Sequence, residues 1–269
     1  MSGAYEDQRI ESELQPVSRA CATDGHLTVS DEAVSSLAPD GNVLFRAQWV
    51  RDGIEEAMYL FSRQIRFGPG KTRDQMDWAL GQTEKVNQIT GLQVSLFMQV
   101  YSPEVGRVGW STFVPDLATL ETAGDKFNAD DSFVAATDKG AAMSVGGADD
   151  SLSQVIYGEP DPSRQIEYVT VVRAVCATGN VARGMEAGVE LAQRAEKIMG
   201  TPSLFLADVT GNYGGVGWVS GYENVHALET AQQALAGDES WAKFVDKETA
   251  GVYAEEPSLT TQIIYRRLA

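Results

Sequence analysis

The chain has 269 residues, 43% of them hydrophobic, and a formal net charge of −17, which fits one large domain or two smaller ones. The acidic balance argues against nucleic acid or an anionic membrane surface as partner, because both attract basic patches. No run approaches the ~18 apolar residues of a membrane span, and the polar N-terminus lacks a secretory core, so we expect a cytoplasmic protein.

Residues 1–56 differ from the remainder of the chain, which is built from two similar copies. Residues 1–25 are polar and acidic, as is typical of a mobile arm. The segment NVLFRAQWV at 42–50 is rich in β-forming residues and predicts an extra strand. We expect 1–56 to supply either an edge-covering strand or lid, or only a variable extension. The second interpretation is favoured for 1–25.

An internal repeat organises residues 57–269. Sliding the sequence by 108 positions aligns 106–157 with 214–265 without a gap, and 16 of the 52 aligned positions are identical. Identity at this level over one fixed offset indicates a duplicated structural unit. The identical pairs include Trp110/Trp218 and, near the end of each copy, Tyr157/Tyr265.

Each copy predicts the same order of elements. A strand is followed by an amphipathic helix, which in copy one starts with the capping-box pair Thr72 and Gln75 and stops at Gly91. Two further strands precede a second helix, which Asp116 or Asn224 opens as N-cap. A short amphipathic turn leads to the last strand. The expected strands are 57–67, 92–101, the residues around Trp110 and 152–157, then 166–176, 203–209, the residues around Trp218 and 260–266.

The order β-α-β-β-α-β is that of a ferredoxin-like unit. Such a sheet has helices on one face and needs a cover for the other, and the second copy is the obvious cover. We therefore predict an α+β protein in which two tandem ferredoxin-like units pack sheet to sheet as an intrachain pseudo-dimeric barrel. The expected parts are an acidic arm (1–56), repeat 1 (57–158), a linker (159–164) and repeat 2 (165–269).

The segment VGWVSGYENVHALETAQQALAGDESWAKF at 216–244 resembles the dimeric α+β barrel superfamily, and within it NIPSNAP-type proteins and antibiotic-biosynthesis monooxygenases. The shared pattern is an aromatic-bearing strand, a helix, and an acidic residue followed by an aromatic one. Here these are Trp218 and Tyr222, then Asp238 and Trp241. The superfamily holds cofactor-free oxygenases, haem enzymes, isomerases and dehydratases. The monooxygenase pattern carries a His inside the helix, where this chain has Ala231.

His226 is the histidine nearest to these aromatic residues. In the first turn of a helix, it is a candidate general base whose proton affinity the positive helix end would lower. The resemblance adds a second candidate role, a haem iron ligand, because related tandem barrels use one His of the second copy. The alternative is a surface or capping His. The pair His226 and Glu229 lacks a third ligand, so we expect no metal site.

Polar residues inside apolar strands are the other candidates. Arg173 and Gln99 interrupt the most apolar strands, and we expect them to donate hydrogen bonds to a substrate oxyanion, unless they reach the rim or a carboxylate. Repeated aromatic residues either fill the core or line a cavity for a flat, apolar substrate. The candidate substrate-binding residues are Trp218, Tyr222, Trp110 and Trp241.

Sequence and resemblance together predict a small-molecule enzyme of bacterial secondary metabolism, a cofactor-independent oxygenase that acts on an aromatic polyketide-like substrate. Two alternatives stay open: a haem-dependent enzyme that uses His226, and a non-catalytic ligand-binding or cyclase-like protein. The expected partner is an apolar aromatic small molecule, without nucleic acid or membrane, in a homodimer or higher oligomer of pseudo-dimers.

Overall fold

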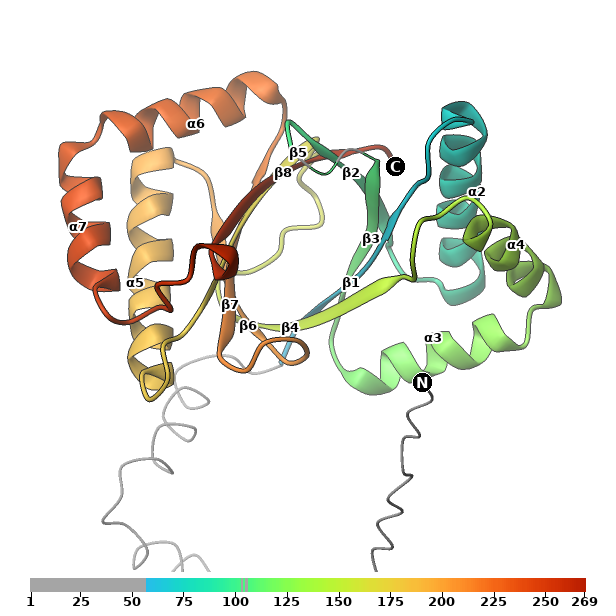
Figure 1. Ribbon diagram of the computed structural model, residues 1–269, viewed down its shortest axis with the longest axis horizontal. Coiled ribbons are helices and arrows are strands. Elements are labelled where there is room, and N and C mark those ends of the chain that lie inside the picture. Colours follow the sequence, from blue (N-terminus) through green and yellow to red (C-terminus); the bar gives the residue numbers. More distant parts are fainter. Residues whose placement is uncertain (1–56, 103, 105) are drawn as a thin grey trace, which may run out of the picture. The chain divides into compact units, whose positions relative to one another are not determined.

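Eight strands and six helices lie between residues 57 and 269 (Figure 1). The computed structural model describes these residues except 103 and 105. The predicted arm 1–56 and its strand at 42–50 lie outside the described residues. The elements follow in this order: β1 (Tyr59–Arg66), α2 (Thr72–Thr90), β2 (Ser95–Val100), β3 (Arg107–Val114), α3 (Leu117–Asn128), α4 (Asp131–Ala141), β4 (Asp149–Tyr157), β5 (Tyr168–Val175), α5 (Val181–Met199), β6 (Ser203–Asp208), β7 (Gly215–Tyr222), α6 (Val225–Gly237), α7 (Glu239–Thr249), the short 3-10 helix η2 (Pro257–Leu259) and β8 (Thr261–Arg267).

The eight strands close into one barrel in the order β1-β3-β2-β8-β5-β7-β6-β4. All neighbours are antiparallel, and β4 pairs with β1 to complete the ring. The expectation of an α+β barrel is thus confirmed. The halves do not meet as two stacked sheets, because the edge strands pair directly, β2 with β8 and β4 with β6. This pairing leaves the barrel without an open edge.

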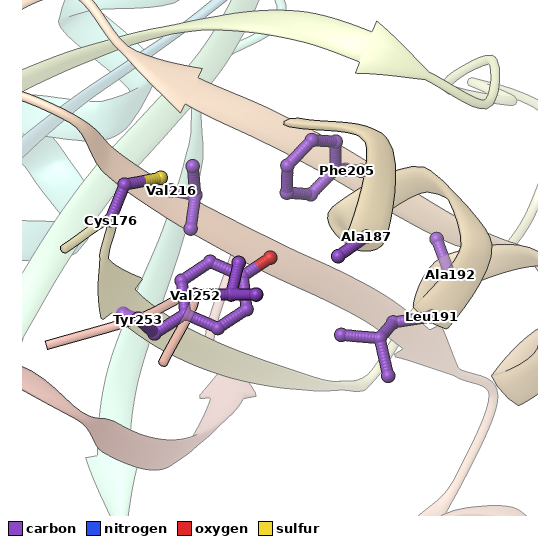
Figure 2. Close-up of a cluster of buried hydrophobic side chains, with 9 residues drawn as sticks. Cys176, Ala187, Leu191, Ala192, Phe205, Val216, Val252 and Tyr253 are labelled. Atoms are coloured by element: carbon purple, nitrogen blue, oxygen red, sulfur yellow. The ribbon is translucent and has the colours of Figure 1, made fainter. Parts of the chain in front are cut away.

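Helices cover the outside of the barrel. Figure 1 shows α2, α3 and α4 together on one side, and α5, α6 and α7 together on the other. In each strand one set of alternate side chains faces these helices and the other set faces the interior. Figure 2 shows the outer core around α5, where Phe205 and Val216 of the strands are fully buried. A second core packs Leu96 and Val108 against Ala79 of α2.

Local signals placed most helix ends correctly. The Asp116 Oδ1 accepts a hydrogen bond from the Thr119 N–H over 2.7 Å, and Asn224 caps α6 in the same way. Gly91 ends α2 in the left-handed conformation, with φ of 76°. The predicted capping box at Thr72 is wrong: Lys71 is the N-cap without a side-chain hydrogen bond, and Gln75 instead donates to the Gly68 carbonyl over 3.0 Å.

In each half, the acidic residue of the predicted pattern is the N-cap of a helix, and the aromatic residue lies in the first turn of that helix. Asp130 is the N-cap of α4, and its Oδ1 accepts from the Phe133 N–H over 2.8 Å. Asp238 caps α7, where its Oδ1 accepts from the Trp241 N–H over 3.0 Å. Both segments are eleven-residue helices rather than the short turns predicted from the sequence. The N-caps explain why an acidic residue precedes the aromatic one by three positions.

Stability at low pH is expected to depend on Asp130. Hydrogen bonds from the Ser132 hydroxyl and the Phe133 N–H lower the pKa of Asp130 from 3.8 to about 2. A carboxyl whose pKa is lower in the folded state stabilises the fold above its unfolded value, and this contribution is lost as the pH falls toward about 2. Asp130→Ala should therefore lower the urea midpoint at neutral pH, with the difference from the wild type shrinking at about pH 2.

Urea unfolding of both proteins at the two pH values measures this, with Asp131→Ala as a neighbouring control that leaves the N-cap in place. A difference between the wild type and Asp130→Ala that is the same at both pH values would show that the charge of Asp130 contributes nothing.

The sequence repeat loses its register before the last strand. Residues 142–148 separate α4 from β4, whereas residues 250–260 separate α7 from β8. Tyr157 and Tyr265, aligned in the sequence, also take different positions, because the register of β4 shifts between Val155 and Tyr157. The Tyr157 hydroxyl donates to Glu196 of α5 over 3.2 Å, on the outside. Tyr265 lines the interior.

Among the described residues, no helix combines the length and apolar character that a membrane crossing requires.

Candidate functional site

A cavity of about 150 Å³ lies inside the barrel. All eight strands contribute to its wall, because the lining side chains are the inward set of each strand. The wall combines apolar side chains with a smaller number of polar ones, the usual composition of a small-molecule site. Its residues are Leu60, Ser62, Gln64, Phe97, Gly109, Ser111, Phe113, Ser151, Ser153, Val169, Val171, Arg173, Leu206, Asp208, Gly217, Val219 and Tyr265.

Two glycines in mid-strand leave room for this cavity. Gly109 of β3 pairs with Gln64 of β1, and Gly217 of β7 pairs with Arg173 of β5. A Cβ at Gly217 would meet no atom closer than 3.5 Å, so a larger side chain there would extend into the cavity. Glycine inside a strand costs stability. Its presence at both positions is what keeps the interior from being filled.

A charged cluster lies on the second half of the wall. Arg173 Nη2 donates to Asp208 Oδ2 over 2.5 Å, and the Ser153 hydroxyl donates to Asp208 Oδ1 over 2.8 Å. The Asp208 side chain is 7% exposed and that of Arg173 is 36% exposed. Each carboxylate oxygen therefore has a donor, which offsets the cost of burying the charge. The arrangement supplies a fixed positive group at the cavity wall.

A neutral cluster occupies the corresponding place in the first half. Leu206 pairs with Gly217 as Phe97 pairs with Gly109, so Asp208 and Gln99 take matching positions two residues further on. Gln99 Nε2 donates to the Tyr265 hydroxyl over 3.4 Å, and Gln64 Nε2 donates to the same oxygen over 3.2 Å. The two halves thus present an ion pair on one side and amide and phenol groups on the other.

Two of the predicted site residues lie at the interior. Arg173 lines the cavity itself. Gln99 is buried and does not line it, and reaches the wall through its hydrogen bond to Tyr265. Arg173 was expected either to face a substrate or to pair with a carboxylate. In the structure it pairs with Asp208 and also faces the interior. Their catalytic roles stay predictions.

The predicted aromatic residues lie outside the barrel wall. Trp218 donates from Nε1 to the Gly188 carbonyl over 2.8 Å, and Trp110 donates to Thr83 Oγ1 over 2.9 Å, so both are held against helices. Tyr222 is 1% exposed and packs with Leu228 of α6.

Trp241 of α7 is partly buried and packs against the core that contains Phe205 and Ala187. Trp218 and Tyr222 both lie between the sheet and the helices, where side chains fill the space. The described cavity is on the opposite face of the sheet.

His226 lies apart from the cavity. It is an exposed residue in the first turn of α6, where Asn224, not His226, provides the cap. The geometry therefore gives His226 no contact with the barrel interior. Among residues 57–269, apart from 103 and 105, no group of three His, Cys, Asp or Glu side chains is placed to hold a metal ion.

Sequence reasoning missed Asp208, Ser153 and Tyr265 as site residues. Asp208 ends an apolar strand, SLFLAD. Because a carboxylate is rarely buried without a partner, its place in a buried strand could have identified Asp208 as a candidate site residue. Tyr265 was one of the repeated aromatic residues that could either fill the core or line a cavity. It pairs with Val169, which lines the cavity, whereas a register shift between Val155 and Tyr157 turns its counterpart in the first copy outward.

The fold, a closed eight-stranded α+β barrel, occurs in other solved structures. No protein-family model matches the chain, and no curated protein sequence does. A candidate monooxygenase from Fusobacterium nucleatum superposes with a TM-score of 0.59 at 8% identity, covering 80% of this chain and 94% of its own. An anthrone oxidase-like protein superposes with a TM-score of 0.56 at 13% identity, covering 80% and 93%. Likeness at such low identity establishes the fold alone.

The expectation of an enzyme without a cofactor requires correction. A haem-binding protein from Thermus thermophilus shares the fold with a TM-score of 0.46 at 11% identity, covering 80% of this chain and 92% of its own. Chlorite dismutases share it as well. This finding overturns the expectation, because the fold occurs in haem proteins as well as in oxygenases.

The described residues do not fit a haem held by His226. An axial ligand must point into a pocket that encloses the macrocycle, and His226 is exposed on α6. The barrel cavity of about 150 Å³ is also smaller than the pockets of about 300 Å³ or more that enclose drug-sized ligands. No step of a reaction is therefore assigned to haem.

Proposed function

We propose that the chain is an oxygenase-like enzyme that binds a small cyclic substrate inside the barrel. The observation that carries the proposal is the barrel cavity, with apolar walls, one ion pair and one phenol cluster. The candidate monooxygenase and the anthrone oxidase-like protein share the fold, and this supports the reaction class by analogy.

The cavity volume favours a substrate with one ring. A cavity of about 150 Å³ is known to accept benzene, and the interior has this volume. We propose a phenol as the substrate, so that the predicted aromatic polyketide is narrowed to a one-ring compound or one ring of a larger molecule. Origin in secondary metabolism stays a prediction, as do the cytoplasmic location, the oligomeric state and the kinship with NIPSNAP-type proteins.

The conversion that we propose is oxidation of the phenol to a quinone. One O₂ takes four electrons from the ring, one of its oxygen atoms replaces two hydrogens as the new carbonyl, and the other leaves as water. Arg173 is proposed to stabilise the negative charge that builds on oxygen as it is reduced, since it brings a positive group to the wall. Gln99 is proposed as a positioning residue that acts through Tyr265.

We also propose that the barrel is an intrachain pseudo-dimer of two ferredoxin-like halves, 57–158 and 165–269, joined by 159–164. The repeated order of elements supports this, as does the matched pairing around Gly109 and Gly217. The two halves have diverged at the interior. Gln64 and Gln99 of the first half occupy the positions that Arg173 and Asp208 occupy in the second half. The charged cluster of Arg173 and Asp208 lines the cavity in one half alone, which supports one reaction site in the described barrel and not two.

Oxygen uptake with one-ring phenols tests the function. The purified protein should consume O₂ with a panel of such phenols, one O₂ for each quinone formed, and should turn over the three-ring compound anthrone much more slowly. The variant Gly217→Phe, which fills the cavity, should lose both binding and uptake while its unfolding midpoint stays near that of the wild type. Gly81→Ala, with no atom within 4 Å of the added carbon, is the matched glycine control.

The results separate the alternatives. Uptake that survives in Gly217→Phe would place the reaction outside the barrel. Binding of phenols without uptake would instead support the ligand-binding alternative without catalysis. An absorbance spectrum of the same preparation identifies any haem or other chromophore that it contains.

A further inference from the structure

Tyr265 presents a hydroxyl group to the barrel cavity from β8. Its oxygen lies 3.2 Å from Gln64 Nε2 and 3.4 Å from Gln99 Nε2, and both amides donate to it. A phenolic oxygen offers few acceptor positions, and two donors occupy them. The remaining capacity of the group is its own O–H donor.

Neighbouring residues contact both amides. The Gln64 Oε1 accepts from Arg107 Nη1 over 3.5 Å, and the Gln99 Oε1 accepts from the Ser102 hydroxyl over 3.3 Å. Arg107 is itself paired with Asp149 over 3.3 Å. Arg107 can only donate, so turning over the Gln64 amide would set its NH₂ group against a donor and lose this contact. In the structure the NH₂ groups of both amides point toward Tyr265.

The O–H of Tyr265 has no acceptor among the residues that the structure describes, 57–269 without 103 and 105. The hydrogen bonds of its hydroxyl group to Gln64 and Gln99 both end on the oxygen. A donor at a cavity wall is satisfied by a group in the cavity, because an unpaired polar group in such a place costs free energy. Water or a ligand oxygen can supply this acceptor.

We propose that Tyr265 selects substrates that carry an acceptor oxygen on a single ring, a phenolate or a ring carbonyl, by donating its O–H to that oxygen. This inference rests on the proposed function, in which the barrel cavity is the substrate site. A neutral phenol is a poorer match than its phenolate, because the occupied Tyr265 oxygen cannot accept the proton of the phenol. Gln64 and Gln99 are positioning residues that keep Tyr265 a donor.

The dye 4-nitrophenol provides a direct test, because its ionised form has a distinct visible absorption band. At the pH where the free dye is half ionised, adding the wild-type protein should increase the phenolate band. Nitrobenzene keeps the nitro group and lacks the phenolic oxygen, so it is the matched control for what that oxygen contributes to binding. In Tyr265→Phe, affinity for 4-nitrophenolate should fall by about tenfold to a hundredfold, with little change for nitrobenzene.

A second variant keeps the hypothesis testable if Tyr265→Phe does not fold. Gln99→Met removes one of the two donors, so that the Tyr265 oxygen can accept again, and the preference for phenolate over phenol should shrink while nitrobenzene still binds. Near-ultraviolet circular dichroism compares the packing of each variant with the wild type.

The outcomes are distinct. Equal weakening of both probes in Tyr265→Phe, or no loss of 4-nitrophenolate affinity, would overturn the role of Tyr265 and leave the proposed function standing. Failure of both probes to bind the wild-type protein would overturn the barrel cavity as the site, and the inference with it.

Discussion

Phe205→Ala is expected to lower the free energy of unfolding by about 3–5 kcal/mol, the usual cost of removing a buried aromatic ring. Phe205 of β6 is 0% exposed and belongs to the core drawn in Figure 2. Its ring centroid is 5.3 Å from that of Trp218. Urea or thermal unfolding measures the loss. Tyr213→Ala is the control, because Tyr213 is 91% exposed and its truncation should change stability by less than about 0.5 kcal/mol.

The contact between Phe205 and α5 leads to a second, related prediction. A Cβ at Gly188 would lie 2.1 Å from Phe205 Cζ, so the helix can approach the strand only with glycine at this position. Gly188→Ala should cost about 1–3 kcal/mol through overpacking. Gly81→Ala, in open space on α2, should instead stabilise the protein by up to about 1 kcal/mol. In a Phe205→Leu background the Gly188→Ala penalty should shrink. Independent, additive effects would show that the two residues do not share this contact.

Arg173→Met is expected to lower both stability and oxygen uptake. Without Arg173, the 7% exposed Asp208 carboxylate keeps only the Ser153 hydrogen bond. Breaking a fully buried pair costs more, but Arg173 is 36% exposed and water can replace part of it, so we expect a loss of about 2 kcal/mol. The double variant Arg173→Met/Asp208→Asn should recover most of this loss because it removes the unpaired charge.

Activity separates the two roles of Arg173. If it stabilises negative charge during the reaction, oxygen uptake stays low in the double variant even though stability returns. Uptake that recovers together with stability would limit Arg173 to a structural role. An undiminished unfolding free energy in Arg173→Met would show that Asp208 is hydrated well enough to need no ion pair.

Arg173 and Gln99 could be identified from the sequence because a polar residue in a buried strand is costly and therefore informative. Their partners could not. Asp208 lies 35 positions from Arg173 along the chain, and Tyr265 lies 166 from Gln99. Only strand pairing brings them together. His226 shows the reverse case, since a plausible local position in a helix start turned out to be exposed.

The sequence by itself determined the order of strands and helices, the helix ends at Asp116, Asn224 and Gly91, and the choice of Arg173 as a candidate site residue. These follow from local hydrogen bonding and from the alternation of side chains along a strand. The tertiary structure decided the edge-to-edge closure of the barrel and the register of its last strand. A strand shifted by one residue exchanges its two faces, and the irregularity between Val155 and Tyr157 of β4 does this locally. That irregularity, which no local pattern encodes, turns Tyr157 toward α5, whereas the pairing of Tyr265 with Val169 keeps Tyr265 at the cavity.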